Sequence, residues 1–252
     1  MMKKEEKKQK KYGLVGKSLS HSFSKKYFTE KFKTYHFDNC EYFNFDIPTI
    51  DFFPQLIADT KGIKGLNITI PYKEKIIPYL DLLSKNAQKI GSVNTVVIHK
   101  NKKLKGYNTD YYGFKKSLKP LLKKHHLKAL ILGTGGASKG VAYALKKLNI
   151  AYDFVSRNPS EFEFAYNDLD ATVFEEYTLI INTTPLGTFP NIDTYPDIDY
   201  SLFSKNHIAF DLVYNPEETV FLKKAKEQGA VTKNGYEMLI FQAEKSWKIW
   251  NK

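Results

Sequence analysis

The stretch that most constrains this chain is a glycine-rich turn between an apolar run and a helical repeat. Residues 129–132 are all apolar, residues 133–138 read Gly-Thr-Gly-Gly-Ala-Ser, and apolar side chains then recur at helical spacing as far as Leu148. This pattern predicts a strand, a tight turn and a helix whose free N–H groups point at the turn. Such a turn suits a diphosphate, and in this context it favours a dinucleotide over an ordinary packing turn or another nucleotide-like ligand.

The next expected strand, residues 152–156, ends where dinucleotide folds hold the adenosine ribose. Asp153 stands about 20 residues after the first glycine, the usual spacing for the acidic residue of an NAD site, but it lies inside the strand rather than at its end. Arg157 follows the strand and is the only arginine in the chain. Because a guanidinium grips a 2′-phosphate bidentately, we expect NADP to be preferred over NAD, with Glu161 opposing that preference.

The strong positive charge does not by itself predict nucleic-acid binding. The net charge is +12, but it comes from lysine, whereas proteins that read bases rely on arginine. A lysine excess fits a solvated surface that attracts acidic small molecules. We therefore expect small-molecule substrates and no nucleic-acid partner.

Other bulk features point to a cytoplasmic protein. No apolar run approaches the roughly 18 residues of a membrane span, so we expect no membrane association. The Lys/Glu-rich residues 1–11 lack the apolar segment of a signal peptide and are expected to be a disordered tail. Cys40 is the single cysteine, which excludes an internal disulfide and fits a reducing compartment. We see no cluster of ligands at metal spacing and expect no metal.

The first half of the chain offers candidate chemistry in one loop and at one lysine, each with a structural alternative. Hydroxyls crowd residues 17–24, before an expected helix, where they either cap the helix or bind a carboxylate. His21 in this loop is either a capping or packing residue or a general base. Lys73 emerges just past a half-polar strand, residues 66–70, and is either a reactive cation or one more surface lysine.

Two further polar residues carry the same ambiguity. Asn94 interrupts an apolar run and, if buried, must find partners, so it is either structural or a ligand contact. Asp110 stands near the start of an expected helix, where capping is the simplest explanation.

The remaining chain alternates strands with helices, which implies an α/β fold with parallel sheets flanked by helices. Further strands are expected at residues 11–16, 42–45, 90–98, 104–107, 178–182, 208–213 and 230–231, and further helices at residues 50–57, 76–83, 220–225 and 236–250.

Eight stretches in order resemble the shikimate dehydrogenase family, and together they cover the chain from about residue 12 to its end. The most distinctive reads Gly-Leu-Asn-Ile-Thr-Ile-Pro-Tyr-Lys at residues 65–73. The others are residues 21–24, 91–95, 106–110, 133–138, 182–187, 211–214 and 238–242.

The resemblance implies a fold and a reaction. It implies an N-terminal α/β substrate-binding domain, residues 11–108, completed by a C-terminal helix at residues 236–252. A Rossmann-like NADP-binding domain, residues 109–235, is inserted between. It also implies an oxidoreductase that uses NADPH to reduce 3-dehydroshikimate reversibly to shikimate, in the chorismate pathway to aromatic amino acids.

The family's functional positions carry over residue by residue. Lys73 and Asp110 match its catalytic pair. The substrate contacts match Ser22, Ser24, Thr69, Asn94, Tyr214 and Gln242. The cofactor contacts match Gly133, Gly135, Gly136, Ala137, Ser138, Ser156, Arg157, Asn158, Thr184, Leu212 and Gly235.

This chain also departs from the family pattern. Lys25 replaces the proline that often follows the second loop serine, Ser156 replaces an asparagine, and Glu161 replaces a second basic residue. The last two keep open a quinate/shikimate dehydrogenase that also uses NAD. A non-catalytic sensor of shikimate-like ligands or a nucleotide is the alternative from another class, and the chain is expected to be a monomer or homodimer.

Overall fold

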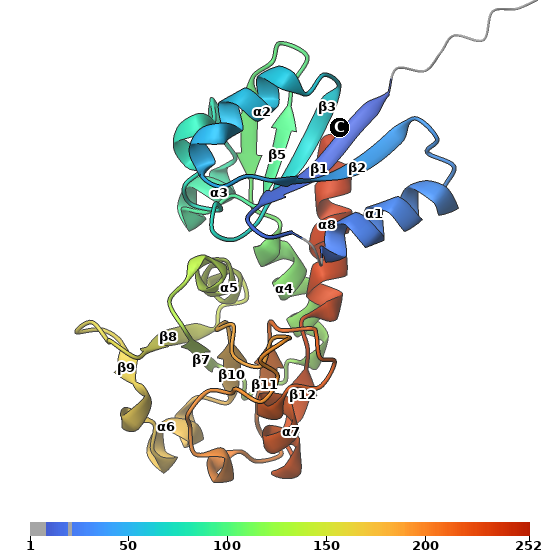
Figure 1. Ribbon diagram of the computed structural model, residues 1–252. Coiled ribbons are helices and arrows are strands. Elements are labelled where there is room, and N and C mark those ends of the chain that lie inside the picture. The colour runs from blue at the N-terminus through green and yellow to red at the C-terminus, as the bar shows by residue number, and fades with distance from the viewer. Residues whose placement is uncertain (1–8, 20–21) are drawn as a thin grey trace, which may run out of the picture. The chain divides into compact units, whose positions relative to one another are not determined.

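The computed structural model describes residues 9–19 and 22–252; His21 and residues 1–8 of the expected tail lie outside that part. The chain divides into two compact units (Figure 1). Unit 1 contains the residues up to Thr109 together with Ser246–Lys252, and unit 2 contains Asp110–Lys245. Each unit is built on one six-stranded sheet with helices, which confirms the predicted α/β class. The finer domain boundaries at residues 108 and 236 remain predictions.

The sheet of unit 1 is mixed, with the strand order β2-β1-β3-β5-β6-β4. β1 pairs in parallel with β2 and β3, whereas β5 runs antiparallel to both β3 and β6. Its strands are β1 (Lys10–Gly16), β2 (Cys40–Asp46), β3 (Ile63–Ile68), β4 (Leu82–Leu83), β5 (Thr95–Ile98) and β6 (Leu104–Tyr107). Its helices are α1 (Phe23–Thr34), α2 (Phe53–Asp59) and α3 (Lys85–Ile90).

Aromatic side chains attach the end of the last helix to the sheet of unit 1. This helix, α8 (Tyr236–Trp250), reaches unit 1 with its last turn. The ring of Tyr12 lies 5.3 Å from that of Trp247, and Phe28 lies 5.3 Å from Trp250. Aromatic pairs of this kind each stabilise a fold by about 0.5–1.5 kcal/mol beyond the area they bury. The polar part of α8 around Ser246 is thereby held against the sheet.

The sheet of unit 2 is entirely parallel in its pairings, with the order β12-β11-β10-β7-β8-β9. The order reverses between β7 and β10, and such a reversal is where doubly wound sheets bind ligands. Its strands are β7 (Lys128–Leu132), β8 (Ala151–Ser156), β9 (Phe164–Ala165), β10 (Leu179–Asn182), β11 (Ile208–Asp211) and β12 (Val231–Lys233). Its helices are α4 (Asp110–Leu118), α5 (Gly136–Lys146), α6 (Ala171–Glu176), α7 (Val220–Glu227) and most of α8.

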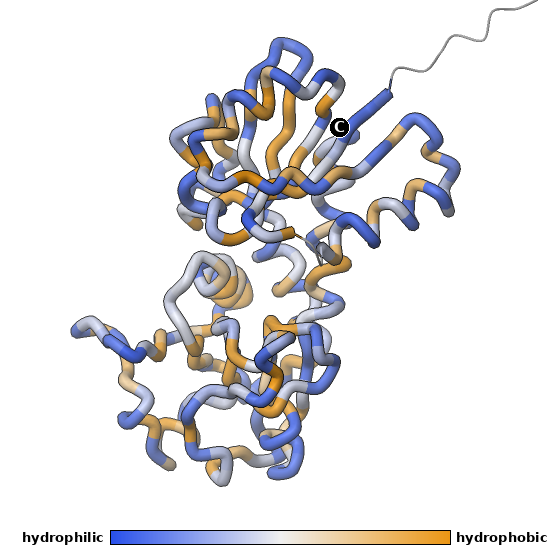
Figure 2. Tube along the Cα trace, viewed as in Figure 1, coloured by the Kyte–Doolittle hydropathy of each residue, from blue (hydrophilic) through white to orange (hydrophobic). Residues whose placement is uncertain are grey.

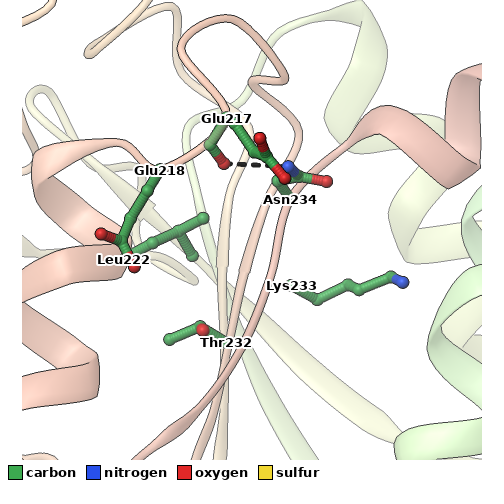
Figure 3. A pocket seen from close by; sticks show the side chains of 6 residues that line it. All are labelled: Glu217, Glu218, Leu222, Thr232, Lys233 and Asn234. Carbon is green, nitrogen blue, oxygen red and sulfur yellow. Dashed lines mark hydrogen bonds between the residues drawn. The ribbon is translucent and has the colours of Figure 1, made fainter.

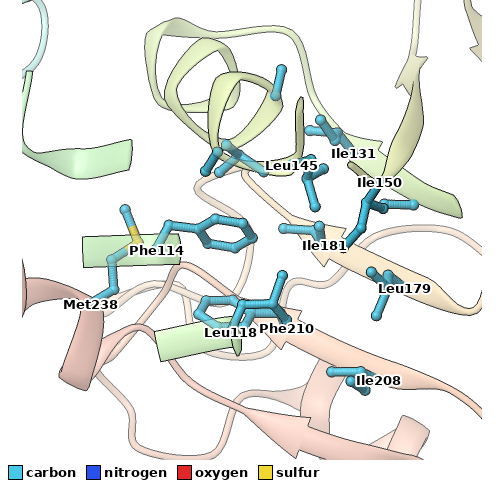
Figure 4. Packing of buried hydrophobic residues seen from close by; sticks show 14 residues of the cluster. Phe114, Leu118, Ile131, Leu145, Ile150, Leu179, Ile181, Ile208, Phe210 and Met238 are labelled. Carbon is cyan, nitrogen blue, oxygen red and sulfur yellow. The ribbon is translucent and has the colours of Figure 1, made fainter. Parts of the chain in front are cut away.

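Two apolar cores cover the two faces of this parallel sheet. One core joins α4, α5 and Met238 of α8 to the strands (Figure 4). In it the rings of Phe114 and Phe210 meet edge to face, with their centroids 4.8 Å apart. The other core packs α6 and α7 onto the opposite face. The central strands β7, β10 and β11 are therefore buried on both sides, as their apolar runs predict, and Figure 2 shows this hydropathy along them.

One region of unit 1 differs from the sequence prediction. A helix expected at residues 76–83 is instead a single 3-10 turn, Ile77–Tyr79, followed by the short strand β4. The strand expected at residues 90–98 begins only at Thr95. Ile90 is instead the last residue of α3, and Gly91 is its C-cap. Single 3-10 turns also occur at Ile50–Phe52, Lys119–Leu121, Tyr166–Asp168 and Tyr200–Leu202.

Candidate active site and dinucleotide site

Lys73 lies in the turn that follows β3. The strand ends at Ile68, two residues before its expected end at Ile70, so Thr69 already belongs to the turn. Tyr72 anchors the turn, since its buried hydroxyl donates to the Ile47 carbonyl at 2.7 Å. The Lys73 carbonyl accepts from the Val93 amide at 2.8 Å, which ties the turn to the residue before Asn94. Lys73 itself is half-buried, as are other lysines of the chain such as Lys105 and Lys139, so burial alone does not distinguish it.

Asn94 lies in a buried hydrogen-bonded cluster of neutral side chains, here called the Asn94 network. Its members are Asn67, Asn94, Thr95, Thr109 and Ser246, all of them buried. Asn94 accepts from the Thr109 amide at 2.6 Å and donates to the Thr109 hydroxyl at 3.0 Å. The Ser246 hydroxyl lies 2.7 Å from that of Thr95 and accepts from the Asn67 amide at 3.2 Å. The network fixes the side chain of Asn94 and the backbone of Thr109, the residue before Asp110.

In the serine loop, residues 17–24, the structure shows helix capping, whereas carboxylate binding stays a prediction. Ser22 is the N-cap of α1 and accepts from the Lys25 amide at 3.2 Å. Ser24 reaches Tyr42: burial raises the pKa of the Tyr42 phenol, and a hydrogen bond with Ser24 lowers it in part. Tyr42 in turn donates to Asn67 at 2.8 Å, so Ser24 connects to the Asn94 network. His21 lies outside the described residues.

In unit 2, Asp110 is the first residue of α4 and is 9 % exposed. One turn later, α4 contacts α8 at Gly113, where an added Cβ would come within 2.4 Å of the Met238 carbonyl and 3.1 Å of the Gln242 amide. Asp110 and Gln242 are therefore brought to the same helix crossing. Tyr214 follows β11, and burial raises the pKa of its phenol.

The glycine turn has the geometry predicted for a diphosphate. Gly133 has φ +100°, a conformation that favours glycine, and a Cβ there would lie 3.1 Å from atoms of Thr183 and Thr184. Gly135 is the N-cap of the 11-residue α5. Among the described residues, no side chain caps this helix and no non-neighbouring atom lies within 4 Å of a Cβ built at Gly135. The open turn and the helix N–H groups fit a bound diphosphate.

The other residues of this turn lie on α5 itself. Gly136 and Ala137 form its first positions. Ser138 is fully buried, and its hydroxyl donates to the Gly135 carbonyl at 2.6 Å. Its side chain therefore sets the shape of the turn, while its predicted contact with the cofactor stays a prediction.

The end of β8 places Arg157 where the sequence predicts it. Ser156 is the last residue of the strand, its hydroxyl accepts from the Asn158 amide at 3.2 Å, and Arg157 is exposed between them. The guanidinium is close enough to Tyr166 to lower the pKa of that phenol, which burial raises more strongly. Asp153 accepts from the Tyr177 hydroxyl at 2.6 Å, a structural role that agrees with excluding it as a ribose ligand.

The remaining predicted cofactor residues lie at the carboxyl ends of β10, β11 and β12. Thr184 follows β10 and packs against Gly133. Leu212 follows β11, and Gly235 lies against it so closely that a Cβ would come within 2.1 Å of the Leu212 carbonyl. These residues and the glycine turn lie at the carboxyl ends of the strands, around the point between β7 and β10 where the strand order reverses.

Sequence reasoning missed four buried polar residues that hold these site residues: Asn67, Thr109, Ser246 and Asp211. A polar residue at the end of an otherwise apolar strand was a usable signal for Asp211 and for Asn67. Ser246 offered none, because its partners lie 137 to 179 residues away along the chain.

Two hollows lie outside the predicted sites. One of about 450 Å³ in unit 2 is lined by Glu217, Glu218, Leu222, Thr232, Lys233 and Asn234 (Figure 3). Its two carboxylates disfavour an anionic cofactor, so we assign the dinucleotide to the glycine turn instead. The other, about 880 Å³ in unit 1, is rimmed by Lys64, Lys100, Lys103, Lys105 and Lys252. In a chain with 39 lysine and arginine residues, such a rim is not a specific signal.

Among the described residues we find neither a metal site nor a membrane-spanning helix. They contain no group of three or more His, Cys, Asp or Glu side chains placed to hold a metal ion. None of their helices combines the length and apolar character needed to cross a membrane.

Comparison with known proteins gives one consistent relationship. The family model described as "Shikimate dehydrogenase substrate binding domain" matches residues 14–96. A curated protein of Clostridium botulinum (strain Loch Maree / Type A3), named shikimate dehydrogenase (NADP(+)), is 40 % identical over 94 % of this chain and 95 % of its own.

Solved structures agree. The shikimate dehydrogenase of Aquifex aeolicus superposes with a TM-score of 0.86 at 35 % identity, covering 96 % of this chain and 92 % of that one. A shikimate 5-dehydrogenase of Thermus thermophilus, solved with NADP(H) and shikimate, gives a TM-score of 0.84 at 29 % identity over 96 % of this chain and 93 % of that one.

Proposed function

The chain belongs to the shikimate dehydrogenase family, and from that premise we propose that it catalyses the NADP-dependent, reversible reduction of 3-dehydroshikimate to shikimate. This is an oxidoreductase step in the biosynthesis of aromatic amino acids. The observation that carries the proposal is the 40 % identity to a named NADP-dependent enzyme across 94 % of the chain. The open glycine turn at the N-terminus of α5 supports the same cofactor class.

Lys73 and Asp110 are proposed as the catalytic pair. Bound NADPH supplies the hydride that reduces the substrate carbonyl. The Lys73 ammonium stabilises the negative charge that develops on the carbonyl oxygen and donates its proton there. In the reverse direction the neutral amine accepts the proton of the shikimate hydroxyl. The Asp110 carboxylate would orient the ammonium.

The substrate contacts remain proposals that their positions support. Ser22 and Ser24 would hold the substrate carboxylate through their hydroxyls, helped by the N–H groups at the start of α1. Asn94 would contact a substrate hydroxyl with an amide already oriented by Thr109. Thr69, Tyr214 and Gln242 are proposed to complete the contacts.

The cofactor contacts are likewise proposed from their places at the carboxyl edge of the parallel sheet. Residues 133–138 would take the diphosphate, while Ser156, Arg157 and Asn158 would meet the adenosine ribose and its 2′-phosphate. Thr184, Leu212 and Gly235 lie at the ends of the strands on the other side of β7, the side that takes the nicotinamide half in this class of fold.

One second candidate function rests on a specific departure. Arg157 is the only guanidinium available for a 2′-phosphate, and Glu161, exposed four residues later, would repel it. A quinate/shikimate dehydrogenase that also uses NAD is therefore the alternative. A cytoplasmic location, supported by the free Cys40, and a monomer or homodimer are part of the proposal.

A matrix of four assays tests the function. Purified protein is mixed with shikimate or quinate and with NADP⁺ or NAD⁺, and absorbance near 340 nm reports the reduced nicotinamide. We expect the fastest turnover with shikimate and NADP⁺. Comparable rates with quinate and NAD⁺ would establish the alternative, and binding without turnover in all four mixtures would indicate a sensor.

A further inference from the structure

Asp211, the last residue of β11, is a fully buried carboxyl group. Its Oδ1 accepts from the Asn182 amide and from the Val213 backbone N–H, both at 3.0 Å. Its Oδ2 accepts from the Thr219 hydroxyl at 2.6 Å. All three donors are neutral. A buried carboxyl without a cationic partner is costly, and burial raises the pKa of Asp211 to about 7.

The carboxyl group decides which way the Asn182 amide points. Oδ1 of Asp211 acts as an acceptor, so the NH₂ end of Asn182 must face it, and the carbonyl end is turned the other way. That carbonyl accepts from the Thr184 backbone N–H at 3.0 Å and from the Thr184 hydroxyl at 2.6 Å. The Thr184 hydroxyl also accepts from the Leu186 amide at 3.3 Å. Asp211 therefore fixes Thr184 through one intermediate side chain.

This chain of hydrogen bonds ends at the glycine turn. Thr183 and Thr184 provide the atoms nearest to a Cβ built at Gly133, at 3.1 Å. The Thr183 hydroxyl donates to the Leu132 carbonyl at 2.7 Å, just before that glycine. Residues 183–187 follow β10, which pairs with β7, and are thus held against the glycine turn that follows β7.

We propose that Asp211 is a positioning residue of the dinucleotide site: through Asn182 it holds Thr184 and segment 183–187 in the conformation that receives the nicotinamide half of the cofactor. The proposal rests on the proposed function, because it takes this edge of the sheet to bind NADP. It requires an acceptor at the Oδ1 position rather than a negative charge. Tyr200, whose phenol is close enough for Asp211 to raise its pKa, is the titratable neighbour, and it lies outside the hydrogen-bonded chain.

The alternative is a purely structural role. Thr219 is the N-cap of α7, so Asp211 could serve only to orient that cap. The two roles predict different variants. Asp211→Asn keeps an acceptor for Asn182 and can turn its NH₂ group to the Thr219 oxygen. Asp211→Leu keeps a similar volume and removes every acceptor, which leaves the Asn182 amide without its partner.

The first test needs no cofactor. Hydrogen exchange of the Thr184 and Leu186 amides is measured in the unliganded protein. We expect exchange to be at least about 10-fold faster in Asp211→Leu and to stay within about 3-fold of wild type in Asp211→Asn, since a lost buried hydrogen bond costs this order of free energy. Asp153→Asn is the matched control, because Asp153 is also a strand carboxylate but bonds Tyr177 and has no link to segment 183–187.

The second test is equilibrium binding. Asp211→Leu should weaken NADP⁺ about 10-fold, equivalent to about 1.4 kcal/mol. It should change the affinity for 2′,5′-ADP, which lacks the nicotinamide half, by less than about 2-fold on the same scale. Asn182→Ala removes the side chain that connects Asp211 to Thr184, so it must reproduce both binding results. This variant keeps the proposal testable if Asp211→Leu does not fold.

The outcomes separate the possibilities. A lower melting temperature with wild-type exchange at Thr184 in folded Asp211→Leu or Asn182→Ala would overturn the proposal and leave Asp211 as a cap support. Equal weakening of NADP⁺ and 2′,5′-ADP would also overturn it. Failure of the wild-type protein to bind NADP⁺ would refute the proposed function, whereas the exchange result would still report on the hydrogen-bonded chain.

Discussion

The two units bury polar networks of opposite character beside their candidate site residues. The Asn94 network of unit 1 contains only amides and hydroxyls. The corresponding cluster of unit 2 is built around the carboxyl group of Asp211, whose pKa burial raises to about 7. A neutral network orients its members at any pH, whereas an ionisable one ties the stability of its unit to pH. The comparison also predicts separable functions: variants of Lys73 and the serine loop in unit 1 should change the handling of shikimate, and variants of Arg157 and Asp211 in unit 2 the handling of the dinucleotide.

Lys73→Ala tests this separation most severely. We expect kcat to fall by roughly 10²–10⁴-fold, the range for a lost acid–base group, with the NADP⁺ dissociation constant nearly unchanged. Steady-state kinetics and calorimetry on the same preparation measure both. A loss smaller than tenfold would make Lys73 an ordinary surface lysine.

The serine loop should show an effect in KM. Removing the hydroxyl of Ser22 or Ser24 deletes a charge-assisted hydrogen bond worth about 1.5–3 kcal/mol, so the KM for shikimate should rise while NADP⁺ binding stays the same. Ser22→Ala should also lower the melting temperature, since it removes the N-cap of α1. A change in stability without any change in KM would reduce the loop to a cap.

Arg157→Ala is the reciprocal test in unit 2. NADP⁺ binding should weaken by roughly 10–100-fold, or about 1.4–2.8 kcal/mol, because a bidentate contact with the 2′-phosphate is lost. NAD⁺ binding and the KM for shikimate should change far less. Equal losses for both cofactors would mean that Arg157 contacts adenine rather than the phosphate.

The smallest expected effect is on the pH dependence of stability. The raised pKa means that folded Asp211 keeps its proton between about pH 4 and 7, where the unfolded chain has lost it, so stability falls as pH rises through this window and levels off above 7. From pH 6 to pH 8, wild type should therefore lose about 1 kcal/mol relative to Asp211→Asn. Urea unfolding at both pH values measures the difference.

The comparison of wild type with Asp211→Asn also controls for the histidines of unit 2. Burial lowers the pKa values of His126 and His207 in the same unit, and their titration gives stability that rises with pH. Both histidines are present in wild type and variant, so their contribution cancels in the difference. A pH-independent difference would show that the Asp211 carboxyl titrates as an ordinary aspartate.

The sequence predicted the parallel unit better than the mixed one. Continuous apolar runs such as residues 129–132 and 179–181 become strands buried on both faces, so their pattern leaves little ambiguity. Residues 76–83 were wrongly predicted as a helix, because Ile76 and its apolar neighbours share a core without a regular backbone. Helix α3 was missed although Ser84 caps its start and the left-handed Gly91 ends it, signals that outweigh an apolar pattern.

The site shows a similar limit. Arg157 could be placed from sequence, because the glycine turn identifies the fold of unit 2 and β8 ends directly before it. Lys73 was placed less well, since it lies five residues after the end of β3. The network around Asn94 could not, since a local pattern cannot reveal a hydrogen bond between Asn67 and Ser246, 179 residues apart. Such contacts depend on tertiary packing rather than on spacing.

The central claim is that Lys73 and Asp110 act as one acid–base pair in a shikimate dehydrogenase. A double-mutant cycle tests it most directly, with kcat for shikimate oxidation measured for wild type, Lys73→Ala, Asp110→Asn and the double variant. Because residues that act as a unit are strongly non-additive, the double variant should be about as slow as Lys73→Ala alone. Losses that multiply in the double variant would contradict the claim.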